Sequence, residues 1–166
     1  GFQPADLTLE ALRTMEQAGV ADVWLTPHIM EDVPNTVGAL KQRFEEFSAT
    51  YNGSVRLHLA AENMLDALFE RRLKAGNLLP LAEKYLLVET SIFAPPMNFR
   101  GLLERIRNKG YTPILAHPER YLYMKKEDYE ALKAQGILFQ RNLYSLRGQY
   151  GERVQKRCRQ LLKWQR

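Results

Sequence analysis

Four side chains of the types that bind metal ions recur at similar intervals along the chain. His28, Glu62, Glu89 and His117 are separated by 34, 27 and 28 residues, and each follows an apolar stretch typical of a short β-strand. One strand with its crossover helix takes about 30 residues. In a barrel of parallel strands the carboxyl ends meet at one mouth, so residues distant in sequence can bind a common ligand there. Two imidazoles and two carboxylates in one mouth predict a metal site.

The donor types narrow the chemistry of that site. Imidazole nitrogen and carboxylate oxygen suit Mn²⁺, Fe²⁺ or Zn²⁺, and without a nearby thiol a structural zinc cluster is disfavoured. A metal held this way polarises a phosphoryl oxygen and lowers the pKa of bound water toward about 7. Taken singly, each of the four residues is more commonly structural, and only their shared position favours a site. We interpret His58, in mid-strand, as a hydrogen-bonded core or barrel-floor residue.

Helices and strands alternate along the chain and would position these residues. Strands are expected near 20–26, 55–61, 85–90, 113–116 and 137–141. Helices are expected near 6–18, 63–75, 99–109, 126–135 and from about 151, with another that Asn35 can cap and that stops at Asn52-Gly53. Strands separated by helices favour a parallel sheet and the α/β class. No low-complexity linker divides the chain, so residues 1–166 are interpreted as a single domain.

Composition excludes several classes of protein. With 166 residues and 45% apolar side chains, the chain can bury a core. Its longest apolar runs, 85–88 and 121–124, are far below the roughly 18–20 residues of a membrane-spanning helix, and nothing resembles a signal peptide. Membrane insertion is therefore not expected. A lone cysteine, Cys158, cannot form an internal disulfide, so a cytoplasmic location is the default expectation.

The net charge of +5 is concentrated at one end of the chain. Residues 147–166 hold seven Lys or Arg against Glu152, while the rest carry 17 basic and 18 acidic residues. We interpret this segment as a helix docked on the barrel with a solvated basic face, or as a contact for an acidic partner or phosphorylated tail. Nucleic acid is not expected as a partner, since no stacking platform accompanies the charges.

Local strings around the four residues resemble motifs of a known superfamily. They are Thr26-Pro27-His28, Ala60-Ala61-Glu62-Asn63, Leu86-Leu87-Val88-Glu89-Thr90 and the most specific, Ala116-His117-Pro118-Glu119-Arg120. Together they resemble the polymerase and histidinol phosphatase (PHP) superfamily. The resemblance is closest to the bacterial capsule-type, metal-dependent tyrosine-protein phosphatases.

The resemblance implies a fold and an activity. The fold would be a distorted (β/α)₇ barrel holding up to three divalent ions and a bridging hydroxide. His28, Glu62, Glu89 and His117 would be metal ligands, and Arg120 would contact the substrate phosphate, as its planar guanidinium suits. The implied reaction is hydrolysis of phosphotyrosine on the tail of a bacterial tyrosine kinase, in the control of exopolysaccharide synthesis, with manganese as one candidate metal.

The chain also departs from the superfamily pattern. The expected His-x-His of a first strand and Asp-x-His of a last strand are absent, so the chain resembles a partial barrel that binds metal weakly and has little activity. Two alternatives stay open, a phosphatase of a small ester such as histidinol phosphate and a noncatalytic regulatory barrel. The apolar loop from Ile92 to Phe99 is expected either to shape an aryl-phosphate pocket or to serve packing.

Overall fold

Seven short parallel strands form the centre of the molecule. The computed structural model describes residues 5–164. Five strands form one sheet in the order β2-β4-β5-β6-β7, with β1 and β3 paired beside it. Their bounds are β1 (Asp22–Leu25), β2 (His28–Ile29), β3 (Arg56–Leu59), β4 (Glu62–Met64), β5 (Tyr85–Glu89), β6 (Thr112–Ala116) and β7 (Leu138–Gln140). The predicted α/β class is confirmed, and across residues 5–164 the strands do not close into a barrel.

Two of the expected strands are each split in two. The stretch predicted as 20–26 forms β1 and resumes as β2 at His28, and the stretch predicted as 55–61 forms β3 and resumes as β4 at Glu62. Pro27 has no N–H to give to a ladder, which accounts for the first break. The register continues across both breaks, since Leu25 pairs with Leu59 and His28 with Glu62. His28 and Glu62 therefore begin strands instead of ending them, and they lie directly opposite each other.

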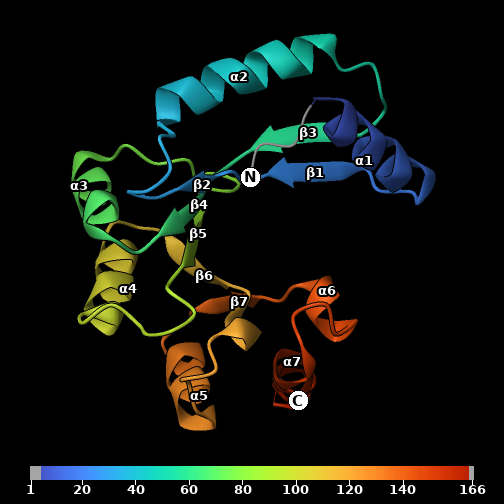
Figure 1. The fold of residues 1–166 in the computed structure, drawn as a ribbon. Coiled ribbons are helices and arrows are strands. Elements are labelled where there is room, and N and C mark those ends of the chain that lie inside the picture. The colour runs from blue at the N-terminus through green and yellow to red at the C-terminus, as the bar shows by residue number, and fades with distance from the viewer. Residues whose placement is uncertain (1–4, 165–166) are drawn as a thin grey trace.

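Seven helices connect and cover the strands of the described chain. They are α1 (Ala5–Gln17), α2 (Val37–Thr50), α3 (Ala67–Ala75), α4 (Phe99–Asn108), α5 (Lys126–Ala134), α6 (Leu143–Leu146) and α7 (Glu152–Lys163). Figure 1 shows α2 lying along the β1–β3 pair, whereas α3, α4 and α5 follow one another beside the larger sheet. The helices alternate with the strands, as the sequence predicts, and α6 was not expected.

Two helix starts differ from the prediction. Thr36, and not Asn35, caps α2 by accepting from the N–H of Ala39. The helix expected from residue 63 begins at Ala67, where the carboxylate of Asp66 accepts from the N–H of Phe69. The preceding residues pair with β5 instead, so sheet hydrogen bonding takes them out of the helix.

The main apolar core lies under the helices that cover β5 and β6. Phe69, Leu86, Leu103, Ile106 and Leu115 are completely buried in it. Burying side chains of this size stabilises the fold by roughly 1.5–3 kcal/mol each. This core packs against one face of β5 and β6 and fixes the position of both strands. The residues at their carboxyl ends are therefore held in place.

The apolar side of the terminal helix α7 is buried as predicted, except at one residue. Val154, Cys158 and Leu161 are buried, but Leu162 is 40% exposed and does not belong to the docked face. Arg157 is not solvated either, because its Nη1 donates to the carbonyl of Met124 at 2.6 Å. The basic face therefore supplies at least one structural contact.

Candidate metal centre

His28 and Glu62 meet across the first strand pair. Each begins a short strand, and the two residues are partners in the parallel ladder. The side-chain amide of Asn35 donates to the carbonyl of His28 at 2.8 Å, which ties the segment after β2 back to the strand. The backbone thus brings together two residues that are far apart in sequence.

Glu89 and His117 join this pair from the next two strands. Glu89 ends β5, and its Oε1 accepts from His28 Nδ1 at 2.8 Å. His117 follows β6, and its Nε2 lies 3.0 Å from Glu62 Oε1 and 3.2 Å from Glu89 Oε2. The structure therefore brings all four predicted residues together, on neighbouring strands β2, β4, β5 and β6. We call them the four-residue cluster.

The backbone at His117 is unusual and explains the direction of its ring. His117 has φ 35°, in the left-handed region that few non-glycine residues adopt. Its N–H donates to the carbonyl of Gln140 on β7 at 2.7 Å, and Pro118 begins the 3-10 turn η1 (Pro118–Arg120) directly after it. Such a conformation costs on the order of 1–3 kcal/mol and persists where the surroundings hold it. Here it turns the imidazole toward Glu62 and Glu89.

The imidazoles and carboxylates of the four-residue cluster shift one another's pKa values. Burial opposes a charged imidazole at His117, but hydrogen bonds to Glu62 and Glu89 outweigh it and raise its pKa to about 9. Burial likewise opposes ionisation of Glu89, yet its hydrogen bonds with His117 and His28 bring its pKa down to about 2. The hydrogen bond to Glu89 also raises the pKa of His28. Positive charge is thus strongly favoured between the two carboxylates.

The donor atoms lie near the spacing that ligands of one divalent cation would have. Ligands that share an ion at about 2.1 Å lie roughly 3.0–3.5 Å from one another. The four imidazole–carboxylate separations are 2.8, 3.0, 3.2 and 3.9 Å. Ligand atoms of His28, Glu62 and Glu89 all lie within 4.8 Å of one another. Among residues 5–164, no Lys or Arg forms an ion pair with Glu62 or Glu89, so these carboxylates remain available to a cation.

Arg120 lies at the end of η1, three residues after His117. Its positive charge acts to lower the pKa of His117, which places the guanidinium near the cluster. The guanidinium carbon lies 5.0 Å from the centroid of the Tyr150 ring. The sequence predicted Arg120 but contained no signal for Tyr150, which comes from the connection between α6 and α7.

The chain matches one family model over its whole length. The model is described as "Capsular polysaccharide synthesis, CpsB/CapC" and matches residues 1–166. The chain belongs to the CpsB/CapC family.

A solved structure has the same fold as this CpsB/CapC chain. Its title is "Crystal structures of YwqE from Bacillus subtilis and CpsB from Streptococcus pneumoniae, unique metal-dependent tyrosine phosphatases". The two chains superpose with a TM-score of 0.86 at 22% identity, over 98% of this chain and 69% of the other. No curated protein matches the chain. No helix among the described residues is long and apolar enough to cross a membrane.

His58 stands apart from the four-residue cluster. Its Nε2 donates to Asp22 Oδ1 at 2.8 Å, and its ring stacks on Trp24 with centroids 4.6 Å apart. The prediction that His58 forms hydrogen bonds within its strand pair agrees with this geometry. Its side chain is 36% exposed, however, so it is not a core residue.

Two buried polar residues, Asn63 and Arg72, lie beneath the cluster. Asn63 is fully buried next to Glu62, and its amide nitrogen donates to the carbonyls of Ala61 and Leu87. Arg72 donates from Nη1 to the Asn63 side-chain oxygen at 3.0 Å and is only 7% exposed. The sequence predicts a solvated helix end at Arg71, Arg72 and Lys74, and for Arg72 this prediction is wrong because its side chain is buried. These contacts fix β4 against β5 directly below Glu62.

The loop after Glu89 leaves most of its apolar side chains in solvent. Phe93 is 85% exposed and Met97 is fully exposed, so neither serves packing, whereas Phe99 packs against the main core. A cavity of about 560 Å³ lies between this loop and α5, lined by Pro95, Phe99 and Tyr123 among others.

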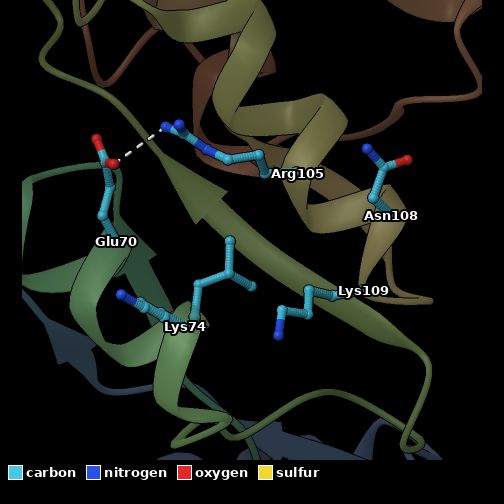
Figure 2. A pocket seen from close by; sticks show the side chains of 6 residues that line it. Glu70, Lys74, Arg105, Asn108 and Lys109 are labelled. Atoms are coloured by element: carbon cyan, nitrogen blue, oxygen red, sulfur yellow. Dashed lines mark hydrogen bonds and ion pairs between the residues drawn. The ribbon is translucent and has the colours of Figure 1, made fainter.

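Figure 2 shows a different pocket, of about 340 Å³, between α3 and α4, where Arg105 pairs with Glu70 at 3.0 Å. Its residues Lys74 and Lys109 lie where these helices end, away from the carboxyl ends of the strands.

Proposed function

We propose that this chain is a metal-dependent phosphatase that hydrolyses phosphotyrosine on a protein. The observation that carries the proposal is the four-residue cluster with Arg120 beside it. The family of capsular polysaccharide synthesis and the fold shared with metal-dependent tyrosine phosphatases support the same reaction. Phosphate ester hydrolysis needs an activated water and a positive site for the phosphoryl oxygens, and the cluster and Arg120 offer one each.

The cluster would hold divalent ions through imidazole nitrogen and carboxylate oxygen. Bound there, Mn²⁺, Fe²⁺ or Zn²⁺ would supply a hydroxide at neutral pH and polarise a phosphoryl oxygen. Glu62 and Glu89 contribute two negative charges, and both are largely buried, with side chains 14% and 8% exposed. His28 is 38% exposed, so the cluster is open to solvent and to substrate on the side of β2.

Protons and metal compete for the imidazoles of the cluster. His117 and His28 must lose their protons to act as ligands, so metal binding releases protons. The carboxylates that raise the pKa of His117 also draw a cation of higher charge. Their attraction for the divalent ion opposes the cost of removing the two protons.

Arg120 would bind the phosphate of the substrate. A guanidinium presents its N–H groups in a planar fork that matches two phosphoryl oxygens, and it stabilises the charge that develops in the transition state. Within residues 5–164 the Arg120 guanidinium has no ion pair with a carboxylate, so its donors remain free for such a ligand.

A protein substrate fits the exposed surroundings of the site. We propose as substrate the phosphotyrosine-bearing tail of a bacterial tyrosine kinase in the control of exopolysaccharide synthesis, which would place the reaction in the cytoplasm. The basic segment begins at residue 147 and approaches Arg120 through Tyr150, and its positive charge would attract such a phosphorylated tail.

The experiment measures bound metal and hydrolysis on the same samples. The chain is loaded with Mn²⁺, Fe²⁺ or Zn²⁺ and assayed on a phosphotyrosine peptide, a phosphoserine peptide and histidinol phosphate. Because the chain lacks the His-x-His and Asp-x-His motifs, we expect metal to bind weakly and hydrolysis to be slow, with the phosphotyrosine peptide cleaved fastest. The Glu89→Gln variant should lose both properties, while His58→Gln, the matched control, keeps both. Faster cleavage of histidinol phosphate would favour a small-ester phosphatase, and metal binding without any hydrolysis would favour a regulatory barrel.

A further inference from the structure

The Arg120 guanidinium is held by an aromatic ring instead of by an acid. Its carbon lies 5.0 Å from the centroid of Tyr150, which is the distance of a cation–π contact. An acidic partner would take up the N–H donors of Arg120 and neutralise its charge. A ring against the face of the guanidinium orients the group while the in-plane N–H groups stay free.

Tyr150 is itself held in place from two sides. Gly148 and Gly151, with φ 82° and 90°, form the turn that presents it, and the N–H of Gly151 donates to the carbonyl of Gly148 at 3.0 Å. The Asn142 side-chain amide donates to the Tyr150 hydroxyl at 3.3 Å. Gly151 also precedes α7, whose apolar face is docked on the core. The ring therefore has a defined place although it is 42% exposed.

The segment that holds Tyr150 also contacts η1, which contains Arg120. The N–H of Asn142 donates to Glu119 Oε1 at 2.9 Å, and Glu119 is fully buried beside Arg120 in η1. Glu119 thus ties η1 to Asn142, Asn142 binds Tyr150, and Tyr150 packs against Arg120. Four residues from η1 and the segment 142–150 form one closed chain of contacts.

We infer that Tyr150 is a positioning residue that preorganises Arg120 for a phosphate dianion. The inference rests on the proposed function, because it assigns Arg120 to phosphate. A free arginine side chain loses rotamer freedom when it binds a ligand, and a group already ordered avoids that loss. Tyr150 acts through Arg120 and does not itself contact the phosphate. Its removal should weaken phosphate binding while leaving the metal cluster intact.

The test measures binding of inorganic phosphate, so it needs no turnover. In the isotope-labelled, zinc-loaded chain, the Nε–H resonance of Arg120 is assigned by its loss in Arg120→Lys and followed during a phosphate titration. Tyr150→Leu should weaken phosphate binding about five-fold, and Tyr150→Phe, which keeps the ring, should restore most of the affinity. The control is Tyr144→Leu, since Tyr144 is 52% exposed in the same segment and should leave the affinity unchanged.

A double variant shows whether Tyr150 acts through Arg120. Because Arg120→Lys removes the Nε–H resonance, phosphate affinity in that background is measured by isothermal titration calorimetry. With Arg120→Lys already present, Tyr150→Leu should cost no further affinity, because coupled residues are not additive. Equal phosphate affinity in Tyr150→Leu and the unaltered chain would overturn the inference, as would a full additional loss in the Arg120→Lys background or the same loss in Tyr144→Leu. A chain that binds phosphate through Arg120 with the expected Tyr150 dependence but hydrolyses no ester would support the inference and count against the proposed reaction.

Discussion

Two histidine–carboxylate groups lie on consecutive strands and have different chemistry. His58 and Asp22 belong to the β1–β3 pair, and the four-residue cluster belongs to the larger sheet. Four residues separate His58 on β3 from Glu62 on β4. Asp22, the partner of His58, also accepts from Arg56 Nε at 2.8 Å, so its charge is balanced. In the four-residue cluster, two carboxylates face two imidazoles, with no Lys or Arg ion-paired to them among the described residues.

Burial adds to the difference. The Asp22 and His58 side chains are 41% and 36% exposed, whereas those of Glu89 and His117 are 8% and 9% exposed. Water screens the charges of Asp22 and His58 and weakens their interaction. The charges of Glu89 and His117 are shielded from water, so their electrostatic interaction stays strong. The comparison shows that a histidine beside a carboxylate is a metal candidate only where the negative charge is left unbalanced and shielded from water.

The strongest way to break the comparison is to change one histidine in each group. His117→Gln should weaken divalent metal binding by more than about 100-fold, because it removes a ligand between Glu62 and Glu89, and ligand loss exceeds the effect of outer-shell changes. His58→Gln should leave the affinity unchanged. Chelator competition measures both, and equal losses would show that the two groups do not differ in the way we describe.

The arginines of the two groups provide the next test. Arg120→Ala should reduce turnover of an aryl phosphate about 100-fold, since it removes stabilisation of transition-state charge. Arg56→Ala, whose partner is Asp22, should leave turnover unchanged. Steady-state kinetics on p-nitrophenyl phosphate with saturating metal decides the matter. Unchanged kinetics for Arg120→Ala would reassign Arg120 to a structural role.

A third prediction concerns stability under the cluster. Asn63→Ala should destabilise the fold by about 1–3 kcal/mol, because it leaves buried carbonyls and the Arg72 guanidinium without their partner. Arg56→Ala, at an exposed ion pair, should cost less than about 1 kcal/mol. Urea denaturation of the metal-free chain compares the two free energies of unfolding. A larger loss for Arg56→Ala would contradict the importance that we give to burial.

The smallest expected effect is a pH dependence at the exposed group. Hydrogen bonds from Arg56 and then His58 lower the pKa of Asp22 from 3.8 to about 2. A carboxyl whose pKa falls on folding contributes stability that is present above its unfolded pKa and is lost as pH falls through the folded value. The stability difference between the chain and Asp22→Asn should therefore shrink as pH falls from about 4 to 2. Denaturant titrations at several pH values measure it, and a constant difference would refute the prediction.

The sequence by itself indicated the alternation of strands and helices and the residues of the candidate site. Apolar periodicity is a local property, so the strands at 85–90 and 113–116 and the helix between them were predicted within a few residues. The spacing of His28, Glu62, Glu89 and His117 matched the repeat of the strands, and parallel strands bring their carboxyl ends to one edge. The joint position of these residues followed from that spacing, although His28 and Glu62 begin β2 and β4 instead of ending strands.

Tertiary structure decided the contacts that local pattern does not encode. Ladder pairing with β5 extended the sheet through Asn63 and shortened the helix that was expected there. The left-handed backbone of His117, the burial of Arg72 and the stacking of Tyr150 on Arg120 all depend on partners from distant segments. Hydrophobic periodicity reports only which side of an element is buried. The choice of polar partner is made by the packing of whole elements, and it separates the balanced charge at His58 from the unbalanced charge at Glu62 and Glu89.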